Sequence, residues 1–388
     1  MINKVVFFRY LPLTKKVFGD FYMQELQNAG FDVEYWYLPF VINIPKQVEI
    51  FEHRYVKVIH SYKALNERLK HEDKEHTIFI SIQTYTGNVL WLYWIMSKNN
   101  CRLSVFGKNM IPVSSIPIEK KYKSLSLSSV FYAISNRLAY YFKKIGIIKS
   151  YEILFLSAES GINAYGYSTK RERFYSKHIL VNSDDYDRAL SVKEGERICD
   201  EEYIVFIDEC LPLHPDIQIC GIKAMNADIY YRDLNAFFDR IEEEFGLRVI
   251  IAAHPKALIY KEKDFFNGRK IMFGKTLELI RDSRFVLFHD STSVGYAVFY
   301  NKPVISLVSN SIKDGQNTTY YSILEFSKQL NSHLIFIDDY IKNNDCILLD
   351  KISIDKDAYN RYKYRYLTNP ETENILSVDL VIKGLKGL

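Results

Sequence analysis

Two apolar runs in the second half of the chain end abruptly in polar residues, and they constrain the fold more than any other feature. Val249–Ala253 runs directly into His254, and Phe285–Phe288 runs into a polar stretch that contains Ser291–Ser293. Unbroken Val, Ile, Leu and Phe runs of this length are typical of strands buried on both faces, as in a parallel sheet. Ligands of open parallel sheets bind just beyond the carboxyl ends of the strands. We therefore expect His254 and the Ser-Thr-Ser cluster to lie at the same edge of one sheet.

Alternation of strand and helix patterns predicts two α/β domains. The first half opens with a strand, a helix over Val17–Gly30 and a second strand, which together form a βαβ unit. Strands are expected at Lys4–Arg9, Val33–Tyr37, Thr77–Ile82, Arg102–Phe106, Tyr151–Leu156, Ile179–Asn182, Tyr203–Ile207, Val249–Ala253, Lys270–Met272, Phe285–Phe288, Pro303–Leu307 and His333–Ile337. We expect Rossmann-like domains with parallel sheets over residues 1–190 and 200–370. A last helix, within 371–388, is expected to return to the first domain.

Composition excludes several classes of protein. Hydrophobic residues at 48% and charged residues at 25% describe a soluble globular chain, and a net charge of +4 gives no reason to expect nucleic acid as a partner. The five cysteines are scattered and form no Cys-x-x-Cys pair, so we expect neither a disulfide framework nor a zinc site, and a cytoplasmic location. The apolar run Val89–Met96 is far shorter than the roughly 20 residues that a membrane-spanning helix needs.

The segment 118–150 differs from the rest of the chain because it mixes basic and aromatic residues. It holds one acid, Glu119, against seven cations: Lys120, Lys121, Lys123, Arg137, Lys143, Lys144 and Lys149. A basic, aromatic amphipathic helix can lie on an anionic bilayer, which here predicts peripheral contact with the cytoplasmic face of the inner membrane. The alternative is an ordinary surface helix whose lysines extend along apolar surface.

Three groups of residues at predicted strand ends carry the candidate chemistry. Asp208 and Glu209 follow one strand, His254 ends the next, and Ser291–Ser293 open a helix after a third. Inverting sugar transfer needs a base for the acceptor proton and a partner for the leaving phosphate. Each group also has an ordinary structural interpretation, as a loop cap, a chance His-Pro pair like that at His214, or a helix N-cap. Together and in this order they favour a functional site.

The same residues carry a resemblance. An acidic pair, a His-Pro pair and a Ser/Thr motif, spread over Tyr203–Leu307, resemble those of the GT-B fold bacterial sialyltransferases, polysialyltransferases and Kdo transferases, and of uncharacterised surface-polysaccharide biosynthesis proteins. The resemblance implies two facing Rossmann-like domains, with the acceptor bound by the first and the nucleotide sugar by the second. It implies a general base at Asp208, with Glu209 left open because Cys210 stands where the motif usually has glycine. It further implies that His254 serves the CMP phosphate, and that Ser291, Thr292 and Ser293 bind that phosphate without a metal ion.

Other polar residues near predicted strand ends are weaker candidates. For the nucleotide they are Pro255, Lys256, Gly274, Lys275 and Thr276, and for the acceptor they are Thr84, Tyr85, Asn88, Glu159 and Ser160. Most of these residues are equally expected in plain turns and helix caps. His289 and Asp290 either face the same edge or merely end their strand.

The resemblance leads to a specific expectation about activity. The expected protein is an inverting, metal-independent transferase that moves a nonulosonic acid (sialic, legionaminic or pseudaminic acid) or Kdo from a CMP-activated donor. The acceptor would be an oligosaccharide or lipid-linked glycan of a bacterial capsule, O-antigen or lipooligosaccharide, and no cofactor is expected. A CDP-glycerol-type polyol-phosphate transferase and an inactive scaffold of a polysaccharide assembly complex remain alternatives. A P-loop and a dinucleotide fingerprint are absent from the sequence, as is a DxD motif in a suitable place.

Overall fold

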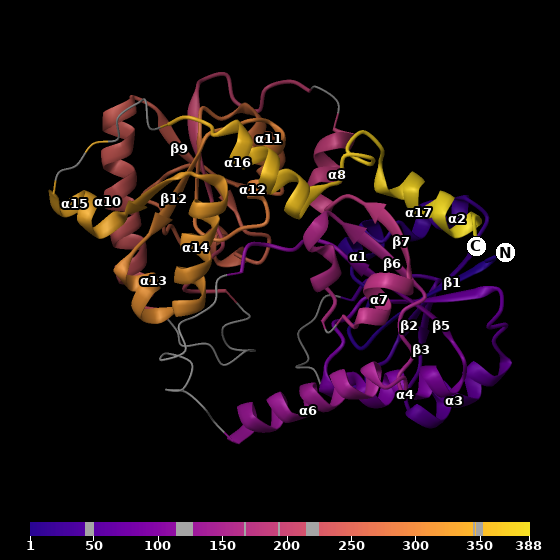
Figure 1. Ribbon diagram of the computed structural model, residues 1–388. Coiled ribbons are helices and arrows are strands. Elements are labelled where there is room, and N and C mark those ends of the chain that lie inside the picture. Colours follow the sequence, from indigo (N-terminus) through magenta and orange to yellow (C-terminus); the bar gives the residue numbers. More distant parts are fainter. Residues whose placement is uncertain are drawn as a thin grey trace. The chain divides into compact units, whose positions relative to one another are not determined.

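The computed structural model describes residues 1–42, 50–113, 127–166, 168–192, 195–214, 225–343, 346 and 352–388. The chain divides into two compact units. The first comprises Met1–Met110, Tyr122–Asp187 and Arg365–Leu388, and the second is built mainly from Arg188–Tyr364. Both contain a parallel sheet with helices on its two faces (Figure 1), so the predicted α/β class is confirmed.

The first unit holds a seven-stranded parallel sheet in the order β3-β2-β1-β4-β5-β6-β7. Its strands are β1 (Lys4–Arg9), β2 (Asp32–Tyr37), β3 (Val56–Val58), β4 (Thr77–Ser81), β5 (Arg102–Gly107), β6 (Ile153–Ser157) and β7 (Lys177–Val181). Its main helices are α1 (Lys15–Asp20), α2 (Met23–Asn28), α3 (Tyr62–His71), α4 (Leu90–Lys98), α6 (Leu127–Lys144), α7 (Lys170–Tyr175), α8 (Asp184–Ser191) and α17 (Ser377–Lys386).

Alternate residues of this sheet enter two separate cores. Val6 and Phe8 of β1 pack with α3, α4 and Ala139 of α6 on one face, whereas Val5 and Phe7 pack with α2 and α17 on the other. This is the period-two pattern of a strand that is buried on both sides. Gly107 at the end of β5 approaches the backbone of Gly161 so closely that a Cβ on it would lie 2.2 Å from the Gly161 carbonyl oxygen.

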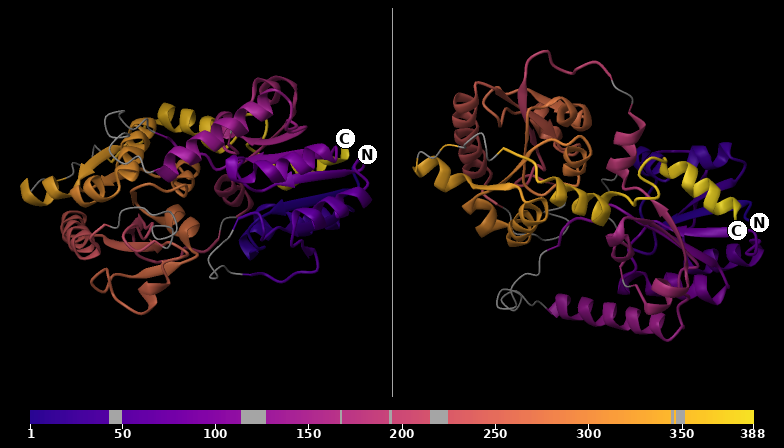
Figure 2. Two further views of the ribbon diagram at one scale, coloured as in Figure 1. Left: turned by 90° about the horizontal axis from the view of Figure 1, so that it is seen from below. Right: turned by 45° about the horizontal axis from the view of Figure 1, so that its top comes forward.

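The C-terminal helix returns to the first sheet, as predicted. Val381 and Leu385 of α17 join the core that contains Ile179 and Val181 of β7. Gly384 makes the close approach possible, because a Cβ at this position would lie 2.5 Å from Ile179 Cδ1. The two chain termini consequently lie side by side at one end of the unit (Figures 1 and 2).

Two local predictions for the first unit were wrong. A single helix was expected over Val17–Gly30, but Tyr22 adopts a left-handed conformation (φ 56°) and separates α1 from α2. No strand was expected between Val33–Tyr37 and Thr77–Ile82, yet Val56–Val58 forms the edge strand β3 before α3 begins at Tyr62. Of the basic segment 118–150, residues 118–126 lie outside the described part of the chain, and α6 covers Leu127–Lys144.

The second unit holds a six-stranded parallel sheet in the order β10-β9-β8-β11-β12-β13. Its strands are β8 (Tyr203–Ile207), β9 (Arg248–Ala253), β10 (Ile271–Phe273), β11 (Val286–Phe288), β12 (Val304–Val308) and β13 (His333–Phe336). Its helices include α10 (Ala227–Phe245), α11 (Thr276–Asp282), α12 (Val294–Phe299), α13 (Asn310–Gly315), α14 (Asn317–Leu330), α15 (Ile337–Asn343) and α16 (Lys356–Tyr362).

Helices of the second unit pack on both faces of its sheet. Phe238 of α10 packs edge-on against Phe206 of β8, and Phe326 of α14 packs edge-on against Phe288 of β11. Since β9 and β10 extend from one side of β8, and β11, β12 and β13 from the other, the strand order reverses between β8 and β11. Open parallel sheets bind ligands at such a reversal. The residues that follow β8 and β11 are therefore the first place to look for a site.

Candidate functional site

Strand pairing in the second unit gathers acidic residues at the reversal point. β8 pairs with β9 on one side and β11 on the other, with Ile207 opposite Ala252 and Phe288. Asp208 and Glu209 follow β8, and Asp290 follows β11 by one further residue. The three carboxylates therefore lie at one edge of the sheet, where their charges act on one another.

Asp208 is held in place by three donors. Its carboxylate accepts hydrogen bonds from the backbone N–H of Cys210 (3.0 Å), the backbone N–H of His254 (3.4 Å) and the hydroxyl of Tyr260 (3.1 Å). The residue is 2% exposed. Burial raises the pKa of Asp208 to about 6, and the three hydrogen bonds limit the rise. Asp208 thus ties the end of β8 to the turn after β9.

The carboxylate of Glu209, unlike that of Asp208, has no hydrogen-bond partner among the described residues. Both of its carboxylate oxygens are buried, and neither makes a hydrogen bond in the described part of the chain. Burial and the neighbouring negative charges of Asp208 and Asp290 raise the pKa of Glu209 well above its ordinary value, and a nearby backbone N–H of Asp290 only partly counters them. A carboxylate with a raised pKa and no engaged oxygen is available to take a proton from another molecule.

Asp290 completes the cluster; the sequence left open whether it faces this edge or merely ends its strand. Burial raises its pKa to about 6, and the hydroxyl of Ser322 donates a hydrogen bond of 2.9 Å to its carboxylate. The signal for it in the sequence was its position at the end of a buried apolar run. His289 beside it is structural, because its ring lies in the core between the Leu307 carbonyl (2.7 Å) and the Tyr230 hydroxyl (3.0 Å). Burial lowers the pKa of His289 to about 4.

His254 is half-buried at the end of β9, on the sheet edge that was predicted. Its Nδ1 accepts a hydrogen bond from the backbone N–H of Lys256 (3.2 Å), so the neutral ring carries its proton on Nε2. The ring of His214 packs against it edge-on, with 4.8 Å between the ring centroids. The structure thus brings together the two histidines of the two His-Pro pairs. Pro255 and Lys256 are exposed in the turn that follows.

The backbone after the acidic pair is strained. Cys210 adopts a left-handed conformation with φ 52°, which is uncommon for a residue other than glycine. Its side chain is buried in the core of the unit. The position where the resembling motif has glycine is thus one that requires a positive φ, and here cysteine occupies it. Although Cys210 replaces the glycine of the motif, it adopts the left-handed conformation that glycine favours, so the turn that positions Glu209 is kept.

The Ser-Thr-Ser cluster lies just before α12. Ser291 and Ser293 are partly exposed and Thr292 is exposed. The Ser291 hydroxyl accepts a weak hydrogen bond of 3.4 Å from the Ser293 backbone N–H, and Ser293 is the N-cap residue without a side-chain cap. The cluster directly follows Asp290, so its hydroxyls belong to the same edge of the sheet as the carboxylates.

Gly274, Lys275 and Thr276 follow β10, which is two strands away from β8. Gly274 has φ 66°, and Lys275 forms an ion pair with Glu278 (2.8 Å) one turn later. Lys275 is the N-cap residue of α11, and Thr276 begins the helix. These residues lie on the predicted edge of the sheet but apart from the acidic cluster.

The predicted acceptor residues of the first unit divide into two groups. Thr84, Asn88 and Glu159 are exposed, and Ser160 is half-buried. Tyr85 is instead fully buried in the core, where its hydroxyl donates a hydrogen bond of 2.9 Å to the Ala139 carbonyl. The structure places the Tyr85 side chain away from the surface, and its contact with an acceptor stays a prediction. In the described residues, no group of three His, Cys, Asp or Glu side chains is arranged to hold a metal ion.

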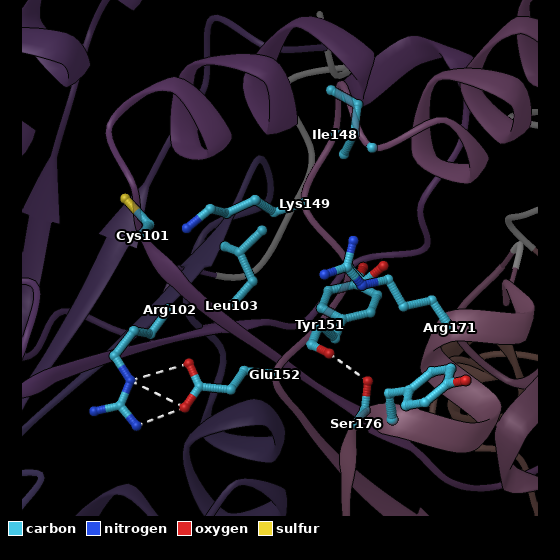
Figure 3. Close-up of a pocket in the computed structure, with 12 residues that line it drawn as sticks. Cys101, Arg102, Leu103, Ile148, Lys149, Tyr151, Glu152, Arg171 and Ser176 are labelled. Atoms are coloured by element: carbon cyan, nitrogen blue, oxygen red, sulfur yellow. Dashed lines mark hydrogen bonds and ion pairs between the residues drawn. The ribbon is translucent and has the colours of Figure 1, made fainter.

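A pocket of 460 Å³ in the first unit lies away from the carboxyl ends of the strands (Figure 3). It lies at the amino ends of β5 and β6, where Arg102 pairs with Glu152 (2.6 Å) and the Ser176 hydroxyl donates to the Tyr151 carbonyl. Parallel sheets bind ligands at the opposite edge. Because this pocket lies at the amino ends of the strands and Arg102 and Glu152 already pair with one another, we assign it no role.

Comparison with known proteins shows the fold. No protein-family model and no curated protein matches the chain. Many solved structures match the chain, and three of them illustrate the similarity. CalG4, the calicheamicin glycosyltransferase, is 9% identical with a TM-score of 0.51, covering 100% of this chain and 98% of that one. The wall teichoic acid polymerase TagF (H444N variant) is 11% identical with a TM-score of 0.51, covering 99% and 89%. A putative UDP-N-acetylglucosamine 2-epimerase from Listeria monocytogenes is 11% identical with a TM-score of 0.50, covering 100% and 96%. Identities this low establish the architecture alone, and the chain has the predicted GT-B fold of two Rossmann-like α/β domains.

Proposed function

We propose that the chain is an inverting glycosyltransferase that uses a nucleotide-activated sugar. One observation carries the proposal: the unengaged, buried carboxylate of Glu209 lies at the strand-order reversal of the second sheet, beside Asp208 and Asp290. A base with a raised pKa is what deprotonation of a sugar hydroxyl near neutral pH requires. The GT-B fold is consistent with this activity.

Glu209 is the better candidate for the base, and Asp208 is a positioning residue. Asp208 uses its carboxylate to hold the Cys210 and His254 backbones and the Tyr260 hydroxyl, so its oxygens are occupied. In the reaction, Glu209 takes the proton of the acceptor hydroxyl while the hydroxyl oxygen attacks the anomeric carbon of the donor. The bond from that carbon to the phosphate oxygen breaks, the nucleotide leaves with the electron pair, and the anomeric configuration inverts.

His254 is suited to the leaving group. The hydrogen bond from Lys256 to Nδ1 fixes the tautomer whose Nε2–H can donate to a phosphate oxygen. The hydroxyls of Ser291, Thr292 and Ser293, on the same edge of the sheet, would hold the other phosphate oxygens. We propose a CMP-activated nonulosonic acid or Kdo as donor, and support for this choice is the order of the acidic, His-Pro and Ser/Thr motifs.

A thermal-shift titration with CMP, CDP, UDP, GDP and ADP, without added metal, tests the donor. A nucleotide that binds only the folded protein raises the melting temperature as its concentration exceeds Kd. We expect a shift with CMP that His254→Ala weakens and Asp339→Asn, an exposed control in α15, leaves unchanged. A shift with CDP but not CMP would favour a polyol-phosphate transferase, and a UDP or GDP shift would replace the CMP donor. Absence of any shift would favour a scaffold.

We also propose that α6 holds the protein on an anionic membrane. One stripe of the helix is exposed, with Phe131 at 71%, Ile134 at 52% and Leu138 at 48%. The opposite stripe packs into the first unit through Asn136, Ala139 and Lys143. Two exposed cations, Arg137 and Lys144, lie on the helix, which contains no acid, and they complement an anionic surface. In the described part of the chain, no helix is both long and apolar enough to cross a bilayer.

Co-sedimentation with vesicles tests the membrane contact. We expect binding to phosphatidylcholine vesicles that contain phosphatidylglycerol, and little binding to phosphatidylcholine alone. Phe131→Ser with Ile134→Ser should abolish binding without unfolding the protein, because both side chains are exposed. Phe174→Ser, which removes an equally exposed aromatic residue on α7, is the matched control. Equal sedimentation of the double variant and the wild type would contradict the proposal.

A further inference from the structure

The first unit contains a second pocket, and Thr84, one of the predicted acceptor residues, is among the residues that line it. It has a volume of 310 Å³ and lies at the carboxyl ends of β1, β4 and β5, lined among others by Arg9, Gln83, Lys108 and Tyr165. In the order β3-β2-β1-β4-β5-β6-β7, the direction of the connections reverses between β1 and β4. This pocket therefore occupies the ligand-binding position of an open parallel sheet.

Three residues that line this pocket each carry a buried donor atom without a partner in the described residues. The Nε2 of Gln83, the hydroxyl of Tyr165 and the Nε of Arg9 are buried atoms without a hydrogen bond. Gln83 is 7% exposed and Tyr165 is 2% exposed. The Tyr10 backbone N–H donates to Gln83 Oε1 (3.2 Å), which fixes the amide so that Nε2 is the unpaired atom. A buried donor without a partner costs about 1–3 kcal/mol, so three together require an explanation.

Charges around the pocket leave Arg9 without a counter-ion. The two acids that line it are already neutralised, since Asp20 pairs with Lys16 and Asp184 pairs with Lys108 (2.5 Å). Lys108 also donates to the Asp20 carbonyl (2.7 Å). No ion pair or hydrogen bond of the Arg9 guanidinium occurs among the described residues. The residues that line the pocket thus include an unpaired guanidinium, an amide and a hydroxyl with unused donors, and among the described residues they include no uncompensated acid.

We propose that this pocket binds an oxyanion, a carboxylate or a phosphate, carried by a molecule of about monosaccharide size. Arg9 is the counter-ion, and Gln83 Nε2 and the Tyr165 hydroxyl donate to the anion. Three donors, one of which belongs to the unpaired cation Arg9, suit an anion with several acceptor oxygens. The volume suits a single sugar ring, at the lower limit of small-molecule sites. This inference stands on the first unit alone and does not depend on the proposed transferase activity.

Thermal-shift titrations of the full chain test the pocket with three probes: glucose 6-phosphate, glucuronate and glucose. We expect one or both acidic sugars, but not glucose, to raise the melting temperature of the wild type. A shift with glucose 6-phosphate alone identifies a phosphate site, and a shift with glucuronate alone identifies a carboxylate site. A shift with neither acid, or an equal shift with glucose, would overturn the proposal.

Variants separate this pocket from any anion site in the second unit. Arg9→Gln should remove the shift and leave the ligand-free protein at least as stable, because it deletes an unpaired charge. Gln83→Glu, similar in size and negatively charged, should also remove the shift. Arg102→Gln is the control, since Arg102 pairs with Glu152 at the opposite edge of the sheet. A shift retained in both Arg9→Gln and Gln83→Glu would contradict the assignment.

Discussion

Replacing Asp290 with asparagine should stabilise the protein, and the gain should depend on pH. Asp290 is half-buried, accepts one hydrogen bond from Ser322, and lies near the negative charge of Glu209. Asparagine has nearly the same shape and can still accept the hydrogen bond from Ser322 through its carbonyl oxygen. It carries no charge, so it avoids the free-energy cost of ionising a carboxyl group in this position.

The magnitude follows from the pKa of Asp290, which burial raises from 3.8 to about 6. Between these values the folded state binds more protons than the unfolded state, so the wild type loses stability as pH rises through this window. Above pH 6 the loss is complete, and a difference of about 2 pKa units corresponds to about 3 kcal/mol. At pH 4.5 the same pKa values give only about 1 kcal/mol. Asp290→Asn should therefore stabilise the protein by these amounts.

Thermal melts followed by circular dichroism at pH 8 and pH 4.5 measure the effect. For a unit of this size, about 3 kcal/mol corresponds to a rise in Tm of roughly 6–12 °C at pH 8, and about 1 kcal/mol to roughly 2–4 °C at pH 4.5. Asp339→Asn, at an exposed position in the same unit, should change Tm little at either pH. Equal gains at the two pH values, or a lower Tm at pH 8, would refute the attribution to carboxylate burial.

Two further predictions concern the first unit, which contains all three tryptophans (Trp36, Trp91 and Trp94), so that urea unfolding can be followed by their fluorescence. In the wild type, Lys143 and Glu172 form an ion pair of 2.6 Å, and both side chains are 0% exposed. Glu172→Gln should lower the free energy of unfolding by about 3–5 kcal/mol, because it leaves Lys143 buried without its charged partner. We expect the double variant, Lys143→Met with Glu172→Leu, to recover much of that loss. If Glu172→Gln alone were as stable as the wild type, the pairing argument would be wrong. Gly107→Ala should lower the free energy of unfolding by about 1–3 kcal/mol, because the Cβ of alanine would lie 2.2 Å from the Gly161 carbonyl oxygen. Gly19→Ala, with open space around it in α1, is the matched control and should be neutral or mildly stabilising.

The sheets could be predicted because their strands are apolar runs buried on both faces. β1 and β8 occur at the predicted residues, Lys4–Arg9 and Tyr203–Ile207. The strand that was missed, β3, is three residues long at the sheet edge and partly exposed, so it lacks an apolar run. The break at Tyr22 was also missed, because no glycine or proline marks the left-handed residue.

The site could be predicted only in outline. Strand ends located Asp208, Glu209 and His254, because the ends of neighbouring parallel strands meet at one edge. The sequence did not distinguish the roles of the two acids, because that distinction depends on which oxygens Tyr260 and the backbone of His254 occupy. Tyr85 was assigned to an acceptor site because it follows a strand, but the nearby Ala139 carbonyl draws its hydroxyl into the core.

The rate of CMP release from CMP-sialic acid, in the presence of a mixture of bacterial oligosaccharide acceptors, tests the central claim most directly. The comparison is between the wild type, Glu209→Gln and the control Asp339→Asn. If Glu209 is the base, the rate for Glu209→Gln should fall by roughly 10²–10⁴-fold, with the fold and the CMP affinity retained. The control should keep the wild-type rate. Equal rates for Glu209→Gln and the wild type would contradict the assignment of the base, and with it the account of how this site works.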